Sequence, residues 1–74
     1  MKSKFVEIPV HEKTYRKSGL VRLETINTDF IVRFYASDNH EFIDDTFIEL
    51  SIKDNGHEII RTSLPYDELR IILS

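Results

Sequence analysis

The stretch that decides the fold runs from residue 46 to residue 62, TFIELSIKDNGHEIIRT. Apolar and polar residues alternate on both sides of Asn55 and Gly56, which is the period of a β-strand with one buried face. Asn-Gly between two such runs is the strongest short-range signal for a β-hairpin, because both residues tolerate the positive φ of a tight turn. We therefore predict strands at 46–53 and 57–62, joined by a tight turn.

Three further strands are predicted upstream, from the same alternation and from an excess of β-branched and aromatic residues. They span residues 5–11, 20–26 and 30–36. Pro9 has no backbone donor, which suggests a sheet edge or a strand end. Residues 27–29, Asn-Thr-Asp, predict a tight connection, because Asn and Asp side chains bond nearby backbone groups.

The C-terminal residues 63–74, SLPYDELRIILS, predict a short helix of about ten residues. Ser63 is the predicted N-cap, and Pro65 falls in the first turn. Asp67 and Glu68 lie near the positive end of the helix dipole. The apolar stripe of this helix consists of Leu69, Ile72 and Leu73. A helix this short is marginal alone in water, so it must dock on the sheet.

Length and composition predict one small domain over residues 1–74. We expect a mainly β fold, with a curved antiparallel sheet or partial barrel of about five strands and a C-terminal helix. The chain has no cysteine, which excludes disulfides and cysteine-based zinc sites. It has no apolar run of membrane-spanning length and no apolar core of a signal peptide. We therefore expect a soluble, cytoplasmic protein without membrane contact.

Two stretches look like sites of chemistry: DNGHEII at 54–60 and its echo DNHEFI at 38–43. The echo is either a duplicated hairpin unit or a convergent turn. His57 and Glu58 are adjacent on a strand, so they point to opposite faces and do not easily share one metal. The chain also has no nucleophile motif and no phosphate-binding glycine loop. We therefore expect binding rather than catalysis, with no metal and no cofactor.

Apolar residues on both faces of the predicted sheet indicate that a second element must bury the face that the helix leaves exposed. Tyr35, Phe42 and Phe47 lie outside the inward register, and Ile31 shares the outer face with Tyr35. One short helix covers only one face. The other cover is a second copy in a two-fold dimer, a partner protein, or the sheet itself curling into a barrel. The leading hypothesis is a protein-interaction module that self-associates through sheet edges or through Ile31, Tyr35 and Phe47.

Charge suggests two alternative functions. Residues 1–22 carry six basic and two acidic groups, a balance of +4, whereas residues 23–74 carry four and eleven, a balance of −7. Basic residues around an aromatic suit a nucleic acid or anionic ligand, as in the loop residues Lys13, Tyr15, Arg16 and Lys17. The pI of about 5.5 counts against this alternative. Acidic side chains suit a phage-type or mobile-element inhibitor that fills a basic groove of a host protein; the candidates are Asp38, Glu41, Asp44 and Asp45.

Four segments also carry a family resemblance. They are KFVEI at 4–8, INTDFIVRF at 26–34, FIELSIKDNGHEI at 47–59 and SLPYDEL at 63–69. In this order they resemble the small FlbD-like proteins found near bacterial flagellar and swarming genes. The segments 11–19 and 36–45 are longer than the family pattern. The resemblance implies a small non-enzymatic accessory protein and brings no catalytic residues with it.

Overall fold

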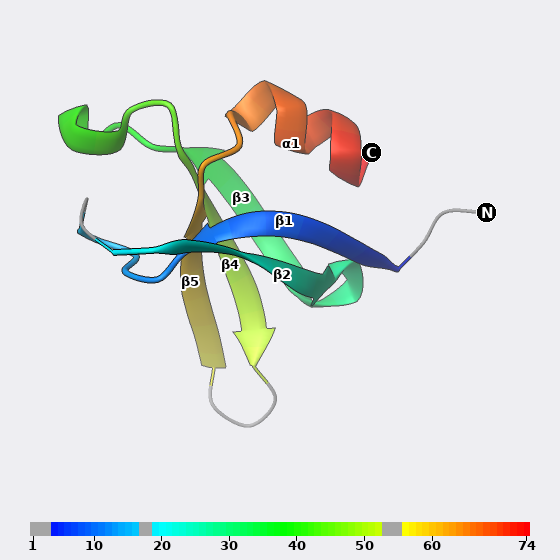
Figure 1. Ribbon diagram of the computed structural model, residues 1–74. Helices are drawn as coiled ribbons and strands as arrows, with labels where there is room; N and C mark the ends of the chain where they lie inside the picture. Colours follow the sequence, from blue (N-terminus) through cyan, green and yellow to red (C-terminus); the bar gives the residue numbers. More distant parts are fainter. Residues whose placement is uncertain (1–3, 17–18, 53–55) are drawn as a thin grey trace.

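The computed structural model describes residues 4–16, 19–52 and 56–74, and its fold confirms the predicted class (Figure 1). Five antiparallel strands form one curved, unclosed sheet, followed by a single C-terminal helix. The elements in chain order are β1 (Phe5–His11), β2 (Val21–Asn27), β3 (Ile31–Ala36), β4 (Thr46–Ile52), β5 (Gly56–Thr62) and α1 (Tyr66–Leu73). Two short 3-10 helices, η1 (Thr28–Phe30) and η2 (His40–Phe42), precede β3 and β4. The described residues contain no helix long and apolar enough to cross a membrane.

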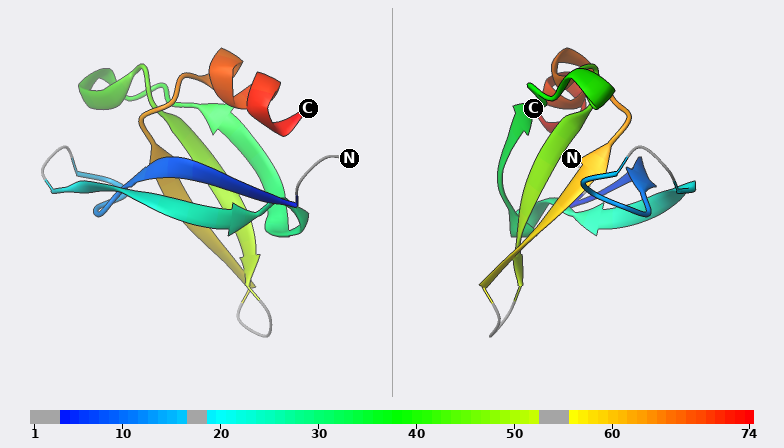
Figure 2. Two further views of the ribbon diagram at one scale, coloured as in Figure 1. Left: turned by 45° about the vertical axis from the view of Figure 1, so that its right-hand side comes forward. Right: turned by 90° about the vertical axis from the view of Figure 1, so that its left-hand side faces the viewer.

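The strand order β2-β1-β5-β4-β3 leaves β2 and β3 at the two ends of the sheet. β1 and β5 are in register at Val10 and Thr62. The β1–β2 hairpin crosses β3, β4 and β5 at a steep angle, as both views in Figure 2 show. Because β2 and β3 are not paired with each other, the sheet keeps two edges instead of closing into a barrel.

The hydrophobic core lies inside the bend of the sheet. Its buried residues are Ile8, Val10, Ile26, Ile48, Ile60 and Leu69. α1 covers one end of this core, with Leu69 fully buried and Leu73 packed beside it, while Ile72 is half exposed. The helix therefore docks on the sheet as its length requires.

The predicted N-cap at Ser63 is wrong. The helix begins at Tyr66 with Pro65 at the N-cap position, and no side chain caps it. A residue that precedes proline is pushed away from helical φ and ψ. Leu64 therefore stays outside the helix, and Ser63 lies too far from the first turn to cap it.

The structure describes the predicted connection at 27–29 in full and the predicted hairpin between β4 and β5 in part. The Asn27 side chain accepts a hydrogen bond from the Asp29 amide at 2.9 Å and caps η1, which confirms the tight connection at 27–29. β4 and β5 pair as far as Ile52 and Gly56, which confirms the hairpin. Gly56 has φ +87°, a conformation that favours glycine. Asp54 and Asn55 lie outside the described residues.

A β-bulge in β3 overturns the predicted faces of that strand. The register shifts between Ile31, opposite Leu50, and Arg33, opposite Glu49. The extra residue brings Ile31 and Phe34 to the core side together. Simple alternation instead grouped Phe34 with Phe30 and Val32, and Ile31 with Arg33 and Tyr35. That prediction is wrong for Ile31, because a bulge adds one residue to the period of two, whereas Arg33 and Tyr35 do share a face.

Candidate functional site

Arg61 on β5 is a charged side chain placed in the interior, only 1% exposed. Its Nη1 donates to Asp45 Oδ2 at 2.7 Å. Its Nη2 donates to the backbone carbonyls of Lys13, at 3.1 Å, and of Arg16, at 2.5 Å. A buried cation is retained only when it is paired and hydrogen-bonded. Arg61 therefore joins three segments of the chain: β5, the loop after β1 and the connection before β4.

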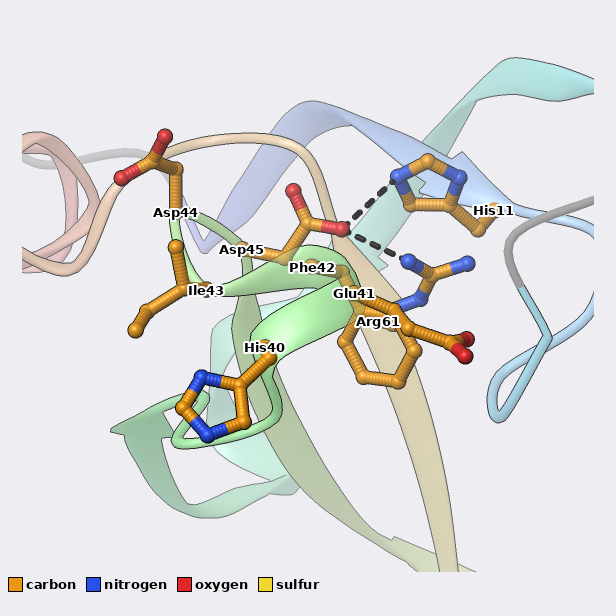
Figure 3. Close-up of a pocket in the computed structure, with 8 residues that line it drawn as sticks. All are labelled: His11, His40, Glu41, Phe42, Ile43, Asp44, Asp45 and Arg61. Atoms are coloured by element: carbon orange, nitrogen blue, oxygen red, sulfur yellow. Dashed lines mark hydrogen bonds and ion pairs between the residues drawn. The ribbon is translucent and has the colours of Figure 1, made fainter.

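His11 and Phe42 complete this group, which we call the Arg61 cluster: His11, Phe42, Asp45 and Arg61. The Arg61 guanidinium lies over the Phe42 ring, 4.2 Å from its centre. His11 Nε2 lies 3.3 Å from the same Asp45 oxygen that binds Arg61, and Figure 3 shows both contacts meeting there. Burial lowers the pKa of His11 and the Arg61 charge lowers it further, against the opposing effect of Asp45. His11 is therefore neutral at pH 7.

A cavity of about 300 Å³ adjoins the Arg61 cluster. Glu41 and Asp44 stand at its rim, and the His40 ring points away from His11 and Asp45 (Figure 3). Within the described residues, no three His, Cys, Asp or Glu side chains are arranged to hold a metal. Asp45 and Arg61 line this cavity as well as binding each other. The geometry thus explains how the loops are held on the sheet.

A second carboxylate, Glu49 on β4, also lies between an arginine and a histidine. Arg33 Nε donates to its Oε2 at 2.7 Å, and His57 Nδ1 lies 2.6 Å from its Oε1. The hydrogen bond from Arg33 lowers the pKa of Glu49, and the same bond raises the pKa of Arg33. His57 is opposite Ser51 and Glu58 is opposite Leu50, so they face opposite sides of the sheet as the alternation predicted.

The structure separates the three predicted interface residues. Ile31 packs against the hydrophobic core because of the bulge. Tyr35 and Phe47 are opposite each other on the outer face, with ring centroids 5.7 Å apart. Phe47 is only 8% exposed, because the rings of Tyr15 and Phe42, each 5.9 Å away, also lie against it. At this end of the sheet the outer apolar face is thus covered by the chain's own loops.

The predicted basic loop provides part of that cover. Lys13 and Arg16 are exposed and bind Arg61 through their backbone carbonyls. The Thr14 hydroxyl donates to the Ile59 carbonyl at 3.1 Å, which holds the loop on β5. Tyr15 packs on Phe47, and Lys17 lies outside the described residues. The described part of the loop therefore has a structural role of its own.

The predicted acidic surface divides in a similar way. Asp38, Glu41 and Asp44 are exposed on the connection between β3 and β4. Asp45 is turned inward, with its side chain 14% exposed, and contacts Arg61 and His11. Three of the four carboxylates therefore remain on the surface, and the fourth belongs to the Arg61 cluster.

The free edge of β2 is a surface that sequence reasoning did not identify. Two of its apolar side chains are exposed, Val21 by 47% and Leu23 by 64%, and Leu20 just before the strand is exposed by 74%. Val21 and Leu23 alternate with Arg22 and Glu24, and a strand in the middle of a sheet can have the same pattern. The strand order, which shows that β2 lies at an end of the sheet, is what identifies the edge.

The backbone of β2 also points toward this edge. Hydrogen-bonded and non-bonded pairs alternate along an antiparallel ladder. Glu12 N donates to Leu20 O at 2.8 Å at one end of the β1–β2 ladder, and Thr28 N donates to Lys4 O at 2.6 Å at the other. The pairs between them that involve Val21, Leu23, Thr25 and Asn27 are therefore non-bonded ones, so these four residues direct their N–H and C=O groups away from β1.

The edge or strand-end position predicted for Pro9 is wrong, because β1 lies between β2 and β5 and Pro9 is inside it, opposite Leu23 in a non-bonded pair. A proline there removes no bond between β1 and β2. In the sheet of the described residues, β2 is hydrogen-bonded to β1 on one side and has no strand on the other. β2 therefore presents backbone donors, backbone acceptors and apolar side chains to solvent along one open edge.

No protein-family model matches this chain, and no curated protein and no solved structure matches it either. The evidence on function therefore comes from the surface of the molecule itself.

Proposed function

We propose that this chain is a non-enzymatic protein-interaction module that self-associates through the free edge of β2. The observation that carries the proposal is the outward backbone of Val21, Leu23 and Thr25 beside exposed apolar side chains. An exposed edge strand is a template for a strand from another chain. In such pairing the main-chain bonds supply affinity, and alternate side chains supply specificity.

The other end of the sheet is less suited to the same role. β3 carries the bulge between Ile31 and Arg33, and a bulge interrupts the regular spacing that a new strand needs. The Arg33 side chain on that strand is already bound to Glu49. The outer face around Phe47 is covered by Tyr15 and Phe42. The β2 edge thus remains the preferred contact surface.

The test is the mass of the protein in solution over a range of concentrations. The monomer is 8.8 kDa, and sedimentation equilibrium is expected to show a monomer–dimer equilibrium in the micromolar range. Leu23→Lys places a charge in the paired edge and is expected to give a monomer. Val32→Lys is the matched control, because Val32 is an apolar residue, half exposed, on the opposite end strand. A wild-type monomer at every concentration would contradict the proposal.

The two alternatives predicted from charge have separate tests. Binding of nucleic acid through Lys13, Arg16 and Lys17 predicts an affinity for oligonucleotides that falls steeply with salt. Binding of a basic partner through Asp38, Glu41 and Asp44 predicts loss of capture when these three are changed to Asn or Gln. The acidic residues and the basic loop both lie outside β2, so self-association is expected to survive Asp38→Asn, Glu41→Gln and Asp44→Asn, and also Lys13→Ala and Arg16→Ala.

A further inference from the structure

We propose that two copies pair β2 with β2 in one antiparallel register, with Leu23 on the two-fold axis and Arg22 of each copy opposite Glu24 of the other. This inference rests on the proposed self-association and specifies its geometry. A two-fold dimer uses the same surface on both copies, so the strand must be complementary to itself.

The backbone limits the possible registers. The groups that point outward belong to Val21, Leu23, Thr25 and Asn27, so these residues of β2 can bond to the second copy. A two-fold axis that pairs at least two of them with β2 of the other copy passes through one of the residues 22–26. With the axis at Leu23, the two Leu23 residues exchange both N–H···O bonds. Val21 of each copy then exchanges its bonds with Thr25 of the other.

Charge selects among these registers, since an axis at Thr25 or Ile26 sets Glu24 against Ile26 or Thr28 and forms no ion pair. An axis at Arg22 places two arginines directly opposite each other, and an axis at Glu24 does the same with two glutamates. Like charges directly opposite on paired strands are destabilising, and opposite charges are stabilising. The axis at Leu23 alone sets Arg22 against Glu24, once on each side of the axis. These are non-bonded pairs, where Cα atoms approach to about 4.5 Å and side chains are closest.

The positions of the side chains agree with this register. Within one chain, Arg22 Nε lies 3.8 Å from Glu24 Oε2, so both groups already share one face of β2. Leu23 lies on the other face, where Pro9 of β1 is its neighbour. The axis brings the two exposed Leu23 side chains together, with a Pro9 beyond each of them. One face of the junction is thus an apolar strip and the other a pair of crossed ion pairs.

The register is tested by exchanging the two charges. Arg22→Glu alone and Glu24→Arg alone each turn both crossed pairs into like-charge pairs. Each is expected to raise the dissociation constant about tenfold or more, from a change of roughly 0.7 kcal/mol or more in each pair. The double variant Arg22→Glu/Glu24→Arg restores opposite charges and is expected to return the dissociation constant to within about threefold of wild type.

Mixing the two single variants gives a second readout. The Arg22→Glu chain presents only acids and the Glu24→Arg chain only bases at these positions. The mixture is therefore expected to form heterodimers at concentrations where each variant alone is monomeric. Circular dichroism and thermal unfolding of each variant check that the fold is kept, since an exposed ion pair within one strand contributes little.

The outcomes separate this inference from the proposed function. If wild type dimerises and Leu23→Lys abolishes the dimer, but the single charge changes leave the dissociation constant unaltered, the register is wrong while association through β2 stands. If the double variant is as weak as the single ones, the crossed pairing is also overturned. If wild type is a monomer throughout, the proposed function itself fails.

Discussion

The Arg61 cluster and the β2 edge differ in where their polar groups find partners. Arg61 is 1% exposed and bonds to Asp45 and to two backbone carbonyls of the same chain. Val21, Leu23 and Thr25 direct backbone groups to solvent beside apolar side chains. Folding supplies partners for both Nη atoms of Arg61, whereas we propose that a second copy supplies partners at β2. Substitutions in the Arg61 cluster should therefore change stability, and those at the β2 edge should change association.

The largest expected effect comes from Arg61→Met. This change removes the cation and leaves Asp45 buried without it, so we expect the free energy of unfolding to fall by about 3–5 kcal/mol. Urea denaturation followed by circular dichroism measures the change. Arg33→Met is the matched control, since Arg33 also binds a carboxylate but its side chain is 66% exposed. An equal loss in both variants would contradict the structural role of Arg61.

A smaller effect concerns pH and again belongs to the Arg61 cluster. The folded pKa of His11 is lowered from 6.5, so the unfolded chain binds the proton more readily. Stability from neutral His11 is therefore fully present above pH 6.5 and is lost as pH falls from there toward the folded pKa. The urea midpoint should fall between about pH 7.5 and about pH 5.5, and His11→Gln should reduce this fall. An equal fall in both proteins would contradict the assignment.

The smallest expected change in stability is at the β2 edge. Leu23→Lys is expected to alter the unfolding free energy of the monomer by less than about 0.5 kcal/mol, as for most surface substitutions. Association adds to apparent stability by mass action, so the wild-type urea midpoint should rise with protein concentration. Leu23→Lys should remove this dependence, and Arg61→Met should keep it. A dependence that survives Leu23→Lys would place the contact elsewhere.

Much of the fold follows from the sequence, because its signals are local. Alternation fixes the strands, and the Asn-Gly hairpin and the Asn27 turn fix how they connect. The faces of β3 do not follow, because the bulge at Val32 leaves no mark in the alternation. The predicted helix start at Ser63 is wrong, because Pro65 keeps the backbone of Leu64 out of the helical conformation, and this outweighs the preference of Ser63 for an N-cap position.

The Arg61 cluster and the β2 edge are harder to predict for a different reason. Arg61 occupies an outward position on its strand, where a charged residue is ordinarily solvated. Its burial comes from segments at 12–16 and 40–45 folding over the outer face. In the sequence, the apolar residues Tyr35 and Phe47 on that face indicate that another segment packs against it. The open edge of β2 depends on strand order, which no local pattern contains.

The most direct test of the paired β2 edges is a disulfide at the proposed axis. The chain has no cysteine, so Leu23→Cys introduces a single thiol. With Leu23 on the axis, the two Cα atoms lie about 5.5 Å apart, within the range of a disulfide, whereas two Thr25 positions lie about 14 Å apart. Mild oxidation is expected to convert Leu23→Cys into a covalent dimer and leave Thr25→Cys monomeric under denaturing conditions. Equal or slower cross-linking of Leu23→Cys would contradict the account.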